Sequence, residues 1–387
     1  MDRRARKLVF VLILSALGPV ALLFGAFFVY DPLALFHPPW GRSATVHGNM
    51  RLHAAGEIRH GDFDSVILGT SILENSSALE ASRILGGHFV NLSISAGDFF
   101  ERGLMLQRLL ERKQVRRVIY SLDFIYLNQR KGYTVFPLST YDFLYDSNPF
   151  NDIRAYLNGH FLSCLARWSR APDCVGRETN LDRPNAWMDE PEYAARFGGF
   201  DAWCRAGDNY QIRDVYEKVS GAVNAIRTGA IEAPDPLQTA RAIDYLENNL
   251  VRWIKEYPDT RFDLVFPPYS RAKLAIWYQS RPGDAQTHLA VIRYLAELSG
   301  RLPNLHVYGF EDQDFPDDIA RYKDMDHFDP EISALITRSI GQEAHRIVPQ
   351  NVERYLAEAE RRGRAYRLDV LAARLAACVK PRTGATP

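Results

Sequence analysis

Asp64-Ser65-Val66-Ile67-Leu68-Gly69-Thr70-Ser71 is the stretch that decides the fold, because an apolar run of strand character ends there in a Gly-Thr-Ser turn. The run is typical of a buried parallel strand, and the turn predicts a change from strand to helix. In an open α/β sheet, ligands bind at the carboxyl ends of the strands, so Ser71 would face a binding crevice. A hydroxyl that only caps the next helix would give the same tripeptide. The stretch alone therefore leaves two roles open for Ser71.

Strands and helices alternate along the chain around this stretch. Apolar runs predict five strands, at 63–69, 89–95, 115–124, 261–266 and 305–310. The spacing of apolar residues predicts helices at 77–85, 99–113, 237–257, 284–298 and 330–347. Such alternation is typical of a mostly parallel sheet with helices on both faces. We therefore expect a three-layer α/β/α domain with a five-stranded sheet.

The segments between these elements set the domain organisation. Residues 132–234 are rich in aromatic residues, proline and aspartate without lasting periodicity, which predicts a large insertion. Its aromatic side chains fit two interpretations, stacking on sugar rings or local packing. The helical, basic tail at 348–387 fits either a membrane or partner surface or packing on the domain. The remaining divisions are an anchor at 1–30, an extended juxtamembrane segment at 31–61 and the α/β domain at 62–347.

Residues Leu8–Tyr30 form an apolar run that is long enough to cross a bilayer as a helix, at about 1.5 Å per residue and roughly 30 Å of hydrocarbon. The basic residues before it are Arg3, Arg4, Arg6 and Lys7. None follows until Arg42, so the positive-inside rule predicts a cytoplasmic N-terminus with the rest of the chain outside the cytoplasm. A cleaved signal peptide is the alternative, but the run exceeds a typical h-region and no small-x-small site follows. We expect a single uncleaved anchor in the lipid bilayer.

Charge and cysteine content limit the function classes. The chain has 47 Lys and Arg against 47 Asp and Glu, which gives no electrostatic footprint for nucleic acid. Its four cysteines would lie in an oxidising compartment, where disulfides persist. Their spacing matches no zinc motif, and we expect no metal or cofactor. Four cysteines allow three full pairings, of which we favour one that joins Cys164 to Cys174.

A set of residues far apart in the sequence offers the parts of a serine nucleophile. Such a serine needs a base, a group that orients the base, and donors for the oxyanion formed on attack. His327 lies on a loop before the last helix of the domain, and Asp324 can accept its Nδ1–H within one tight turn. The second strand ends at Gly97, where the lack of a Cβ lets a backbone N–H approach a substrate oxygen. Each residue also has a plain structural role, as a cap, a turn or a surface histidine.

Three sequence blocks resemble the SGNH (GDSL) hydrolase superfamily. They are Gly69-Thr70-Ser71, Asn91-Leu92-Ser93-Ile94-Ser95-Ala96-Gly97-Asp98 and Asp324-Met325-Asp326-His327. The resemblance implies that Ser71 is the nucleophile and that Asp324 and His327 complete a triad. It also implies an oxyanion hole formed by the backbone N–H groups of Ser71 and Gly97.

One block departs from that family. Its Gly-x-Asn-Asp motif supplies an asparagine donor, whereas the third strand here runs into Ser121-Leu122-Asp123-Phe124. Asn128, or a group from the insertion, is the candidate substitute. With an N-terminal anchor, this departure resembles the SGNH-like proteins of polysaccharide modification, such as the alginate O-acetylation proteins and the DltD proteins. That resemblance implies a single-pass protein of the bacterial inner membrane with most of its chain in the periplasm.

The leading expectation is a periplasmic acyltransferase that O-acetylates an exported or cell-surface polysaccharide through an acyl-Ser71 intermediate. The resemblance implies a glycan acceptor and a membrane-bound protein that donates the acyl group. A carbohydrate esterase or deacetylase would use the same triad with water as the acceptor. A non-catalytic assembly or glycan-binding protein that keeps the fold is the third hypothesis.

Overall fold

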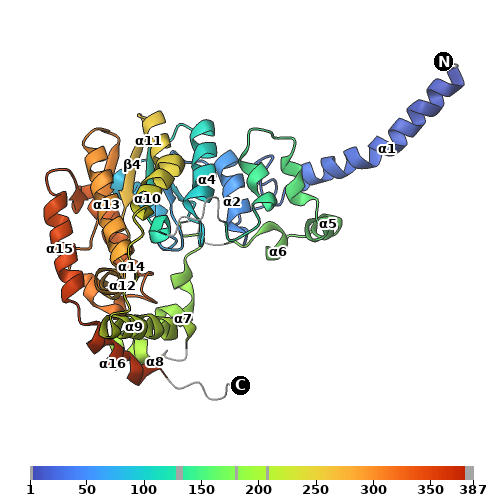
Figure 1. Ribbon diagram of the computed structural model, residues 1–387. Coiled ribbons are helices and arrows are strands. Elements are labelled where there is room, and N and C mark those ends of the chain that lie inside the picture. Colours follow the sequence, from blue (N-terminus) through green and yellow to red (C-terminus); the bar gives the residue numbers. More distant parts are fainter. Residues whose placement is uncertain (1–2, 128–133, 179–181, 206–208, 380–387) are drawn as a thin grey trace. The chain divides into compact units, whose positions relative to one another are not determined.

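The computed structural model describes residues 3–127, 134–178, 182–205 and 209–379 (Figure 1). The chain forms two compact units, each built from separate segments. The first, here the anchor unit, comprises Met1–Asp62, Gln107–Lys113 and Phe136–Leu181. The second, here the sheet unit, comprises Phe63–Leu106, Gln114–Val135 and Asp182–Pro387. The predicted insertion is thus divided, with part of it in each unit.

A six-stranded sheet forms the centre of the sheet unit, with the strand order β2-β1-β3-β4-β5-β6. The strands are β1 (Ser65–Leu68), β2 (Phe89–Asn91), β3 (Arg117–Ser121), β4 (Arg261–Val265), β5 (Leu305–Tyr308) and β6 (Arg346–Ile347). All neighbouring pairs are parallel except β5 and β6, which are antiparallel. The prediction of a mixed α/β protein with a mostly parallel sheet is confirmed.

The sixth strand corrects the predicted helix at 330–347. Helix α14 (Pro330–Gln342) ends at Glu343, which adopts a left-handed conformation with φ of 52°. His345 is also left-handed, with φ of 58°. These two residues turn the chain back, so that Arg346 and Ile347 pair with β5 instead of continuing the helix.

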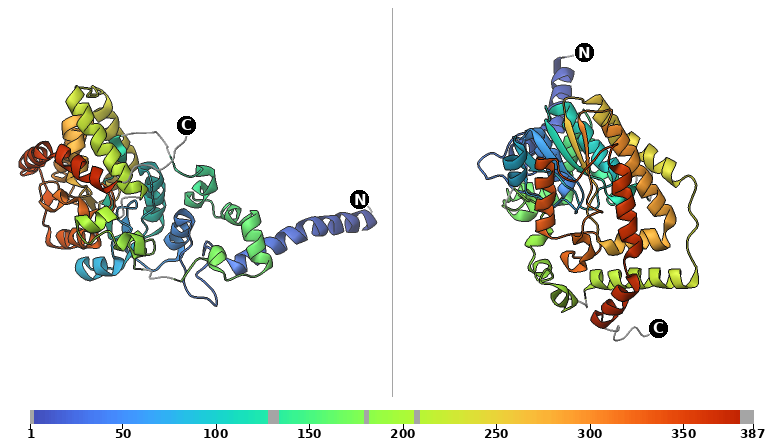
Figure 2. Two further views of the ribbon diagram at one scale, coloured as in Figure 1. Left: turned by 90° about the horizontal axis from the view of Figure 1, so that it is seen from below. Right: turned by 90° about the vertical axis from the view of Figure 1, so that its left-hand side faces the viewer.

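The strand order reverses next to β1, which positions the site. The chain runs from β1 to β2 on one side and then crosses to β3 on the other. Right-handed crossovers in opposite directions place helices on both faces of the sheet. The right-hand view in Figure 2 shows the strands of the sheet unit between its helices. In such folds the ligand crevice opens where the order reverses, here between the carboxyl ends of β1 and β3.

The helices of the sheet unit follow the predicted alternation with some differences. They are α3 (Ala78–Leu85), α7 (Pro191–Ala194), α8 (Phe200–Arg205), α9 (Tyr210–Thr228), α10 (Gln238–Leu246), the π-helix η6 (Glu247–Val251), α11 (Arg252–Glu256), α12 (Arg271–Ser280), α13 (Pro282–Ser299), α14, α15 (Val352–Ala365) and α16 (Leu368–Cys378). Helix α4 (Phe99–Arg112) contributes to both units. The 3-10 helices are η1 (Phe124–Leu127), η5 (Trp187–Asp189), η7 (Phe315–Asp317) and η8 (Ile319–Arg321). The predicted helix at 237–257 is interrupted by η6, and α12 was not predicted.

Helix α9 lies in the segment for which the sequence suggested no lasting periodicity. Its buried face is a narrow row formed by Ile212, Val215, Val219 and Ala222. Only small and medium side chains mark this face, which explains why the pattern is weak. The C-terminal tail packs within the sheet unit, with α15 against α12 and α16 against α9.

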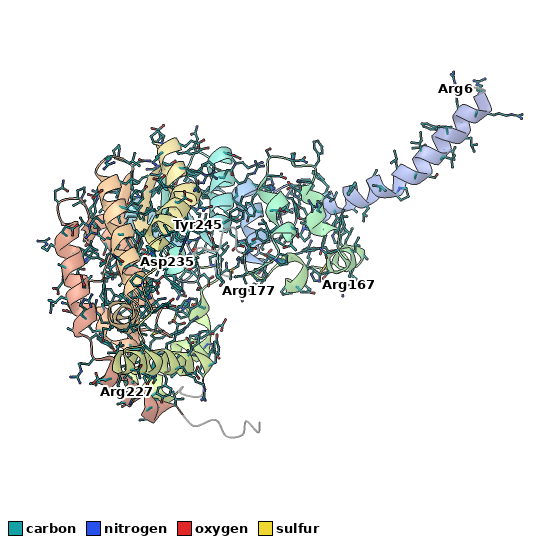
Figure 3. The ribbon with its side chains drawn as sticks, viewed as in Figure 1. Arg6, Arg167, Arg177, Arg227, Asp235 and Tyr245 are labelled. Atoms are coloured by element: carbon teal, nitrogen blue, oxygen red, sulfur yellow. A yellow bond between two sulfur atoms is a disulfide. The ribbon has the colours of Figure 1, made fainter. Side chains whose placement is uncertain are left out.

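The anchor unit begins with α1 (Arg3–Tyr30), an exposed apolar helix long enough to cross a membrane. Figure 3 labels Arg6 near the free end of this helix. At its other end Asp31 turns the chain, since its carboxylate accepts the N–H groups of Leu35, Phe36 and His37 and the hydroxyl of Tyr156. The unit also contains α2 (Met50–His60), α5 (Gly159–Ala166), α6 (Pro172–Val175), η2 (Leu138–Thr140), η3 (Asp142–Tyr145) and η4 (Asp152–Tyr156). Helix α2 occupies part of the juxtamembrane segment that we expected to be extended.

Each unit contains one disulfide. Cys164 pairs with Cys174 in the anchor unit, which is the pairing favoured from the sequence. Cys204 pairs with Cys378 in the sheet unit and ties α8 to α16. His160 lies near Cys164 and Cys174, but these sulfurs are bonded to each other and are not thiolate ligands for a metal.

We expect the two disulfides to differ in their effect on stability. In the chain-entropy model, closing the 10-residue separation contributes about 2.7 kcal/mol and closing the 174-residue separation about 5 kcal/mol. Thermal unfolding of the Cys204→Ser/Cys378→Ser variant should therefore occur at a lower temperature than that of Cys164→Ser/Cys174→Ser. A smaller loss for the Cys204 pair would contradict this ranking.

Candidate active site

The structure brings Ser71, His327 and Asp324 together in the sheet unit. Ser71 Oγ lies 2.7 Å from His327 Nε2, and His327 Nδ1 lies 2.8 Å from Asp324 Oδ2. An ionised Asp324 fixes the tautomer of His327, because the His327 Nδ1–H group donates to the Asp324 carboxylate. His327 Nε2 is then free to accept the Ser71 proton. The arrangement is that of a serine nucleophile with its base and orienting carboxylate.

A small closed loop holds Asp324 and His327. Tyr322 and Phe328 form an antiparallel bridge, and Lys323 N–H donates to the His327 carbonyl at 2.8 Å. Inside the loop, Asp324 Oδ1 accepts the N–H groups of Asp326 and His327 at 2.7 and 2.9 Å. One carboxylate thus supports the backbone with one oxygen and the imidazole with the other.

The environment keeps Asp324 ionised. Burial by itself would raise the pKa of this carboxyl group. The charge of His327, its ring hydrogen bond and the two backbone N–H groups outweigh burial and hold the pKa of Asp324 well below its usual range. An ionised Asp324 stabilises the imidazolium that forms when His327 takes a proton.

A buried hydrogen-bond network lies under the Ser71 turn. Asp123 Oδ1 accepts the Thr70 hydroxyl at 2.9 Å, and Oδ2 accepts the Ser121 hydroxyl at 2.6 Å. The guanidinium of Arg102 lies 3.1 Å from Asp123 and donates to the Ser121 carbonyl. Gly69 is required here because a Cβ would meet Ser121 Oγ at 2.8 Å. Asp123 therefore fixes the turn, and both of its carboxylate oxygens act as acceptors there.

The structure adds a second candidate for the oxyanion donor beside Ser71. Gly97 N–H donates to the Ile94 carbonyl at 3.0 Å, so it is engaged in a local turn. Ala96, and not Gly97, lines the pocket, and it adopts the left-handed conformation with φ of 53°. Within the described residues, the N–H groups of Ser71 and Ala96 have no hydrogen-bond acceptor. The predicted substitute Asn128 lies outside the described residues.

A pocket of about 570 Å³, here the site pocket, opens at the triad. It is lined by Thr70, Ser71, Ile72, Ala96, Asp98, Asp123, Phe124, Ile125, Val135, Asp326 and His327. These residues follow β1, β2, β3 and β5, as expected for a crevice at the carboxyl ends of parallel strands.

Asp98 connects the site pocket to the start of α4. Its carboxylate accepts the Phe100 N–H at 2.9 Å, and Glu101 reaches back to the Asp98 N–H at 3.3 Å, which forms a capping box. The hydroxyl of Tyr245, labelled in Figure 3, also contacts this carboxylate. Burial is the main reason why the pKa of Asp98 rises to about 6, although hydrogen bonding from Phe100 and the charge of Arg102 oppose it.

The raised pKa of Asp98 predicts a pH-dependent penalty on folding. As pH rises from about 4 to about 6, this carboxyl ionises in the unfolded chain first, which favours unfolding. The Asp98→Asn variant keeps the cap without ionising, so its melting temperature relative to the wild type should rise between pH 4 and pH 7. A difference that stays constant across this range would contradict the assignment.

Trp187 and Lys323 belong to the site but were not predicted. Trp187 Nε1–H donates to the Ser71 carbonyl at 2.9 Å, and its ring meets the His327 ring edge-on at 5.7 Å. Lys323 Nζ lies 4.0 Å from the centre of the Trp187 ring. Trp187 lies in the aromatic-rich insertion, where no spacing separates it from the other aromatic residues. Its position favours packing against the triad over sugar stacking.

Comparisons with protein-family models, with curated proteins and with solved structures give no match. The class of this protein is therefore defined by its own fold and site. It is a mixed α/β protein with a mostly parallel six-stranded sheet, one N-terminal helix apolar enough to cross a membrane, and a serine, a histidine and an aspartate in contact at the carboxyl edge of the sheet.

Proposed function

We propose that this protein is a membrane-anchored serine acyltransferase of the SGNH type, which O-acetylates a polysaccharide outside the cytoplasm. The observation that carries the proposal is the hydrogen-bonded chain from Ser71 through His327 to Asp324 at the edge of a pocket. Two disulfides support an oxidising compartment, and α1 supports attachment to the inner membrane.

The chemistry would proceed in two steps. Ser71 Oγ attacks the carbonyl carbon of the acyl donor while its proton passes to His327 Nε2. The backbone N–H groups of Ser71 and Ala96 stabilise the oxyanion that forms. The bond to the donor's leaving group then breaks, and that group takes the proton from His327. In the second step a sugar hydroxyl attacks the acyl-Ser71 ester, His327 accepts its proton, and Ser71 Oγ leaves and regains a proton.

The molecule that accepts the acyl group, a sugar or water, distinguishes the proposed acyltransferase from a carbohydrate esterase. Sugar and water are both oxygen nucleophiles, and the same triad activates either one. A transferase excludes water from the acyl-enzyme until the sugar hydroxyl is in place. The acyl donor must be presented on the same side of the membrane, and the resemblance to the polysaccharide O-acetylation proteins implies a membrane-bound donor protein.

The test combines labelling of the serine with identification of the product. One sample of the full-length protein in detergent micelles is incubated with a fluorophosphonate, with Ser71→Ala as the control. A second, unlabelled sample is incubated with an activated acetyl ester and an oligosaccharide. We expect labelling that requires Ser71 and acetyl groups on the sugar. Labelling with release of free acetate alone would favour the esterase. Equal labelling of both proteins, or none, would favour a non-catalytic glycan-binding protein.

A further inference from the structure

A second pocket of about 410 Å³ lies beside the site pocket, within the same unit. Phe124 and Asp326 line both pockets, so these two side chains form the wall between them. The second pocket runs between α9 and α12, and here it is called the side pocket. Figure 3 marks the end of α9 with Arg227. A ligand in the side pocket would lie against two side chains that also line the site pocket.

The side pocket combines a smooth floor with an aromatic wall. Gly221, which has no side chain, and the methyl groups of Ala222 and Ala225 line the pocket on the face of α9. Phe124 and Trp277 provide ring surfaces on the other side. Its volume is in the range of pockets that hold small ligands, and aromatic faces with nearby polar groups suit sugar rings.

Every cationic side chain that lines the side pocket has a carboxylate partner. Lys273 Nζ contacts Asp326 and lies 3.3 Å from the centre of the Phe124 ring. Arg281 pairs with Asp284 at 2.8 Å, and the exposed Lys218 pairs with Asp214 at 2.6 Å. With Glu232 also in the lining, the pocket carries three basic and three acidic side chains.

The charged residues that line the site pocket are acidic, which disfavours binding of an anion. The pocket presents Asp98, Asp123 and Asp326, and no lysine or arginine is among its described lining residues. An anionic ligand that spans both pockets would meet these carboxylates. Its own carboxylate would also have to replace Asp326 as the ion-pair partner of Lys273. The partly buried Asp326 would then have no cation beside it.

We propose that the side pocket is the acceptor subsite and that it takes an uncharged sugar, not a uronate. This inference rests on the proposed function, because it assigns the alcohol that attacks acyl-Ser71. The sugar ring lies on the α9 face at Gly221, Ala222 and Ala225, because Lys273 Nζ covers the Phe124 ring, and its hydroxyls meet the paired charges of the pocket rim. The reacting hydroxyl passes Phe124 and Asp326 to reach the acyl carbonyl beside His327.

Gly221 allows the side pocket to be filled without changing the site pocket. A Cβ built at this position has nothing within 4 Å, and Gly221 is part of the side-pocket lining. Gly221→Phe places a ring in the pocket, and Gly221→Ala is the matched control with only a methyl group. Both substitutions favour the helical state of α9 relative to glycine.

The experiment uses full-length protein in detergent micelles and two readouts. The first is hydrolysis of p-nitrophenyl acetate, which needs only the site pocket. The second is binding of a panel of neutral hexasaccharides (glucan, mannan and galactan) and of a hexauronate, measured by saturation-transfer NMR with Ser71→Ala as the parent. We expect neutral binding in the parent, at least tenfold weaker binding after Gly221→Phe, and no change after Gly221→Ala. Ester hydrolysis by Gly221→Phe on the wild-type background should stay within about twofold of the wild type.

The outcomes separate this inference from the function on which it rests. Tighter binding of the uronate, no binding of any neutral sugar, or neutral binding unaffected by Gly221→Phe would each overturn the side-pocket assignment, even if ester hydrolysis is intact. Absence of Ser71-dependent hydrolysis in the wild type would instead overturn the acyltransferase proposal. Neutral-sugar binding blocked by Gly221→Phe would then still identify a neutral-glycan site.

Discussion

Replacement of Ser71 by alanine is expected to lower kcat for acyl transfer by a factor on the order of 10⁶, because Ser71 carries the hydroxyl that contacts the base His327. The folded structure should be nearly unaffected. The Ser71→Ala variant lacks the hydrogen bond between Ser71 and His327, which corresponds to a loss of about 1 kcal/mol in the free energy of unfolding. Turnover of an activated acetyl ester, measured together with thermal unfolding, checks both expectations.

A serine on the neighbouring strand end provides the control. Ser95 donates to Glu74 at 2.6 Å and does not line the site pocket. Ser95→Ala should therefore keep turnover within about threefold of the wild type, a change expected from the loss of about one hydrogen bond. If Ser71→Ala keeps more than a few per cent of wild-type turnover, Ser71 is not the nucleophile.

Asp324→Asn is expected to lower kcat by about 10⁴-fold while leaving Ser71 and His327 in place. An amide at this position can donate to His327 Nδ1, which moves the ring proton to Nε2 and removes the acceptor for the Ser71 proton. Ser71 in the Asp324→Asn variant should also react much more slowly with a fluorophosphonate. Wild-type rates of labelling and turnover in this variant would show that Asp324 does not orient the base.

The low pKa of Asp324 also gives this variant a signature in stability. A carboxyl group whose pKa is depressed on folding stabilises the folded state above its unfolded pKa of about 4, and this contribution is lost as pH falls toward the folded value. The stability of the wild type should therefore exceed that of Asp324→Asn near neutral pH. The difference should shrink below about pH 4 in acid unfolding measurements. A difference that grows at low pH would contradict an ionised Asp324.

Much of the sheet could be read from local sequence. The strands β1, β3, β4 and β5 are buried on both faces, which favours apolar side chains along each strand. The apolar run is continuous in Val66-Ile67-Leu68 and Val118-Ile119-Tyr120, and β4 and β5 keep apolar pairs beside one polar residue. The two-residue β6 carries no such run, so it was missed. Helix α9 was missed because its buried face uses few large side chains. The order of Gly69-Thr70-Ser71 and Asp324-Met325-Asp326-His327 pointed to the residues that the structure places in contact.

Other parts of the site depend on contacts between distant segments. Nothing near Trp187 in the sequence indicates that its indole donates to the Ser71 carbonyl. The choice between Ala96 and Gly97 depends on which N–H the turn after β2 leaves unpaired. The pairing of Lys273 with Asp326 joins residues 53 positions apart. These features depend on how the elements pack, and local periodicity carries no information about them.

The sequence by itself determined an apolar N-terminal helix, a mostly parallel α/β core, a serine after a predicted strand, and an aspartate and a histidine on a predicted loop. These features follow from hydropathy, periodicity and turn chemistry, which act over a few neighbouring residues. Only the tertiary structure decided that Ser71 and His327 lie 2.7 Å apart, that Asp123 supports the turn, and that a charge-balanced pocket adjoins the site. The physical reason is that distances between side chains 256 positions apart are set by the packing of the sheet and its helices, and not by either segment alone.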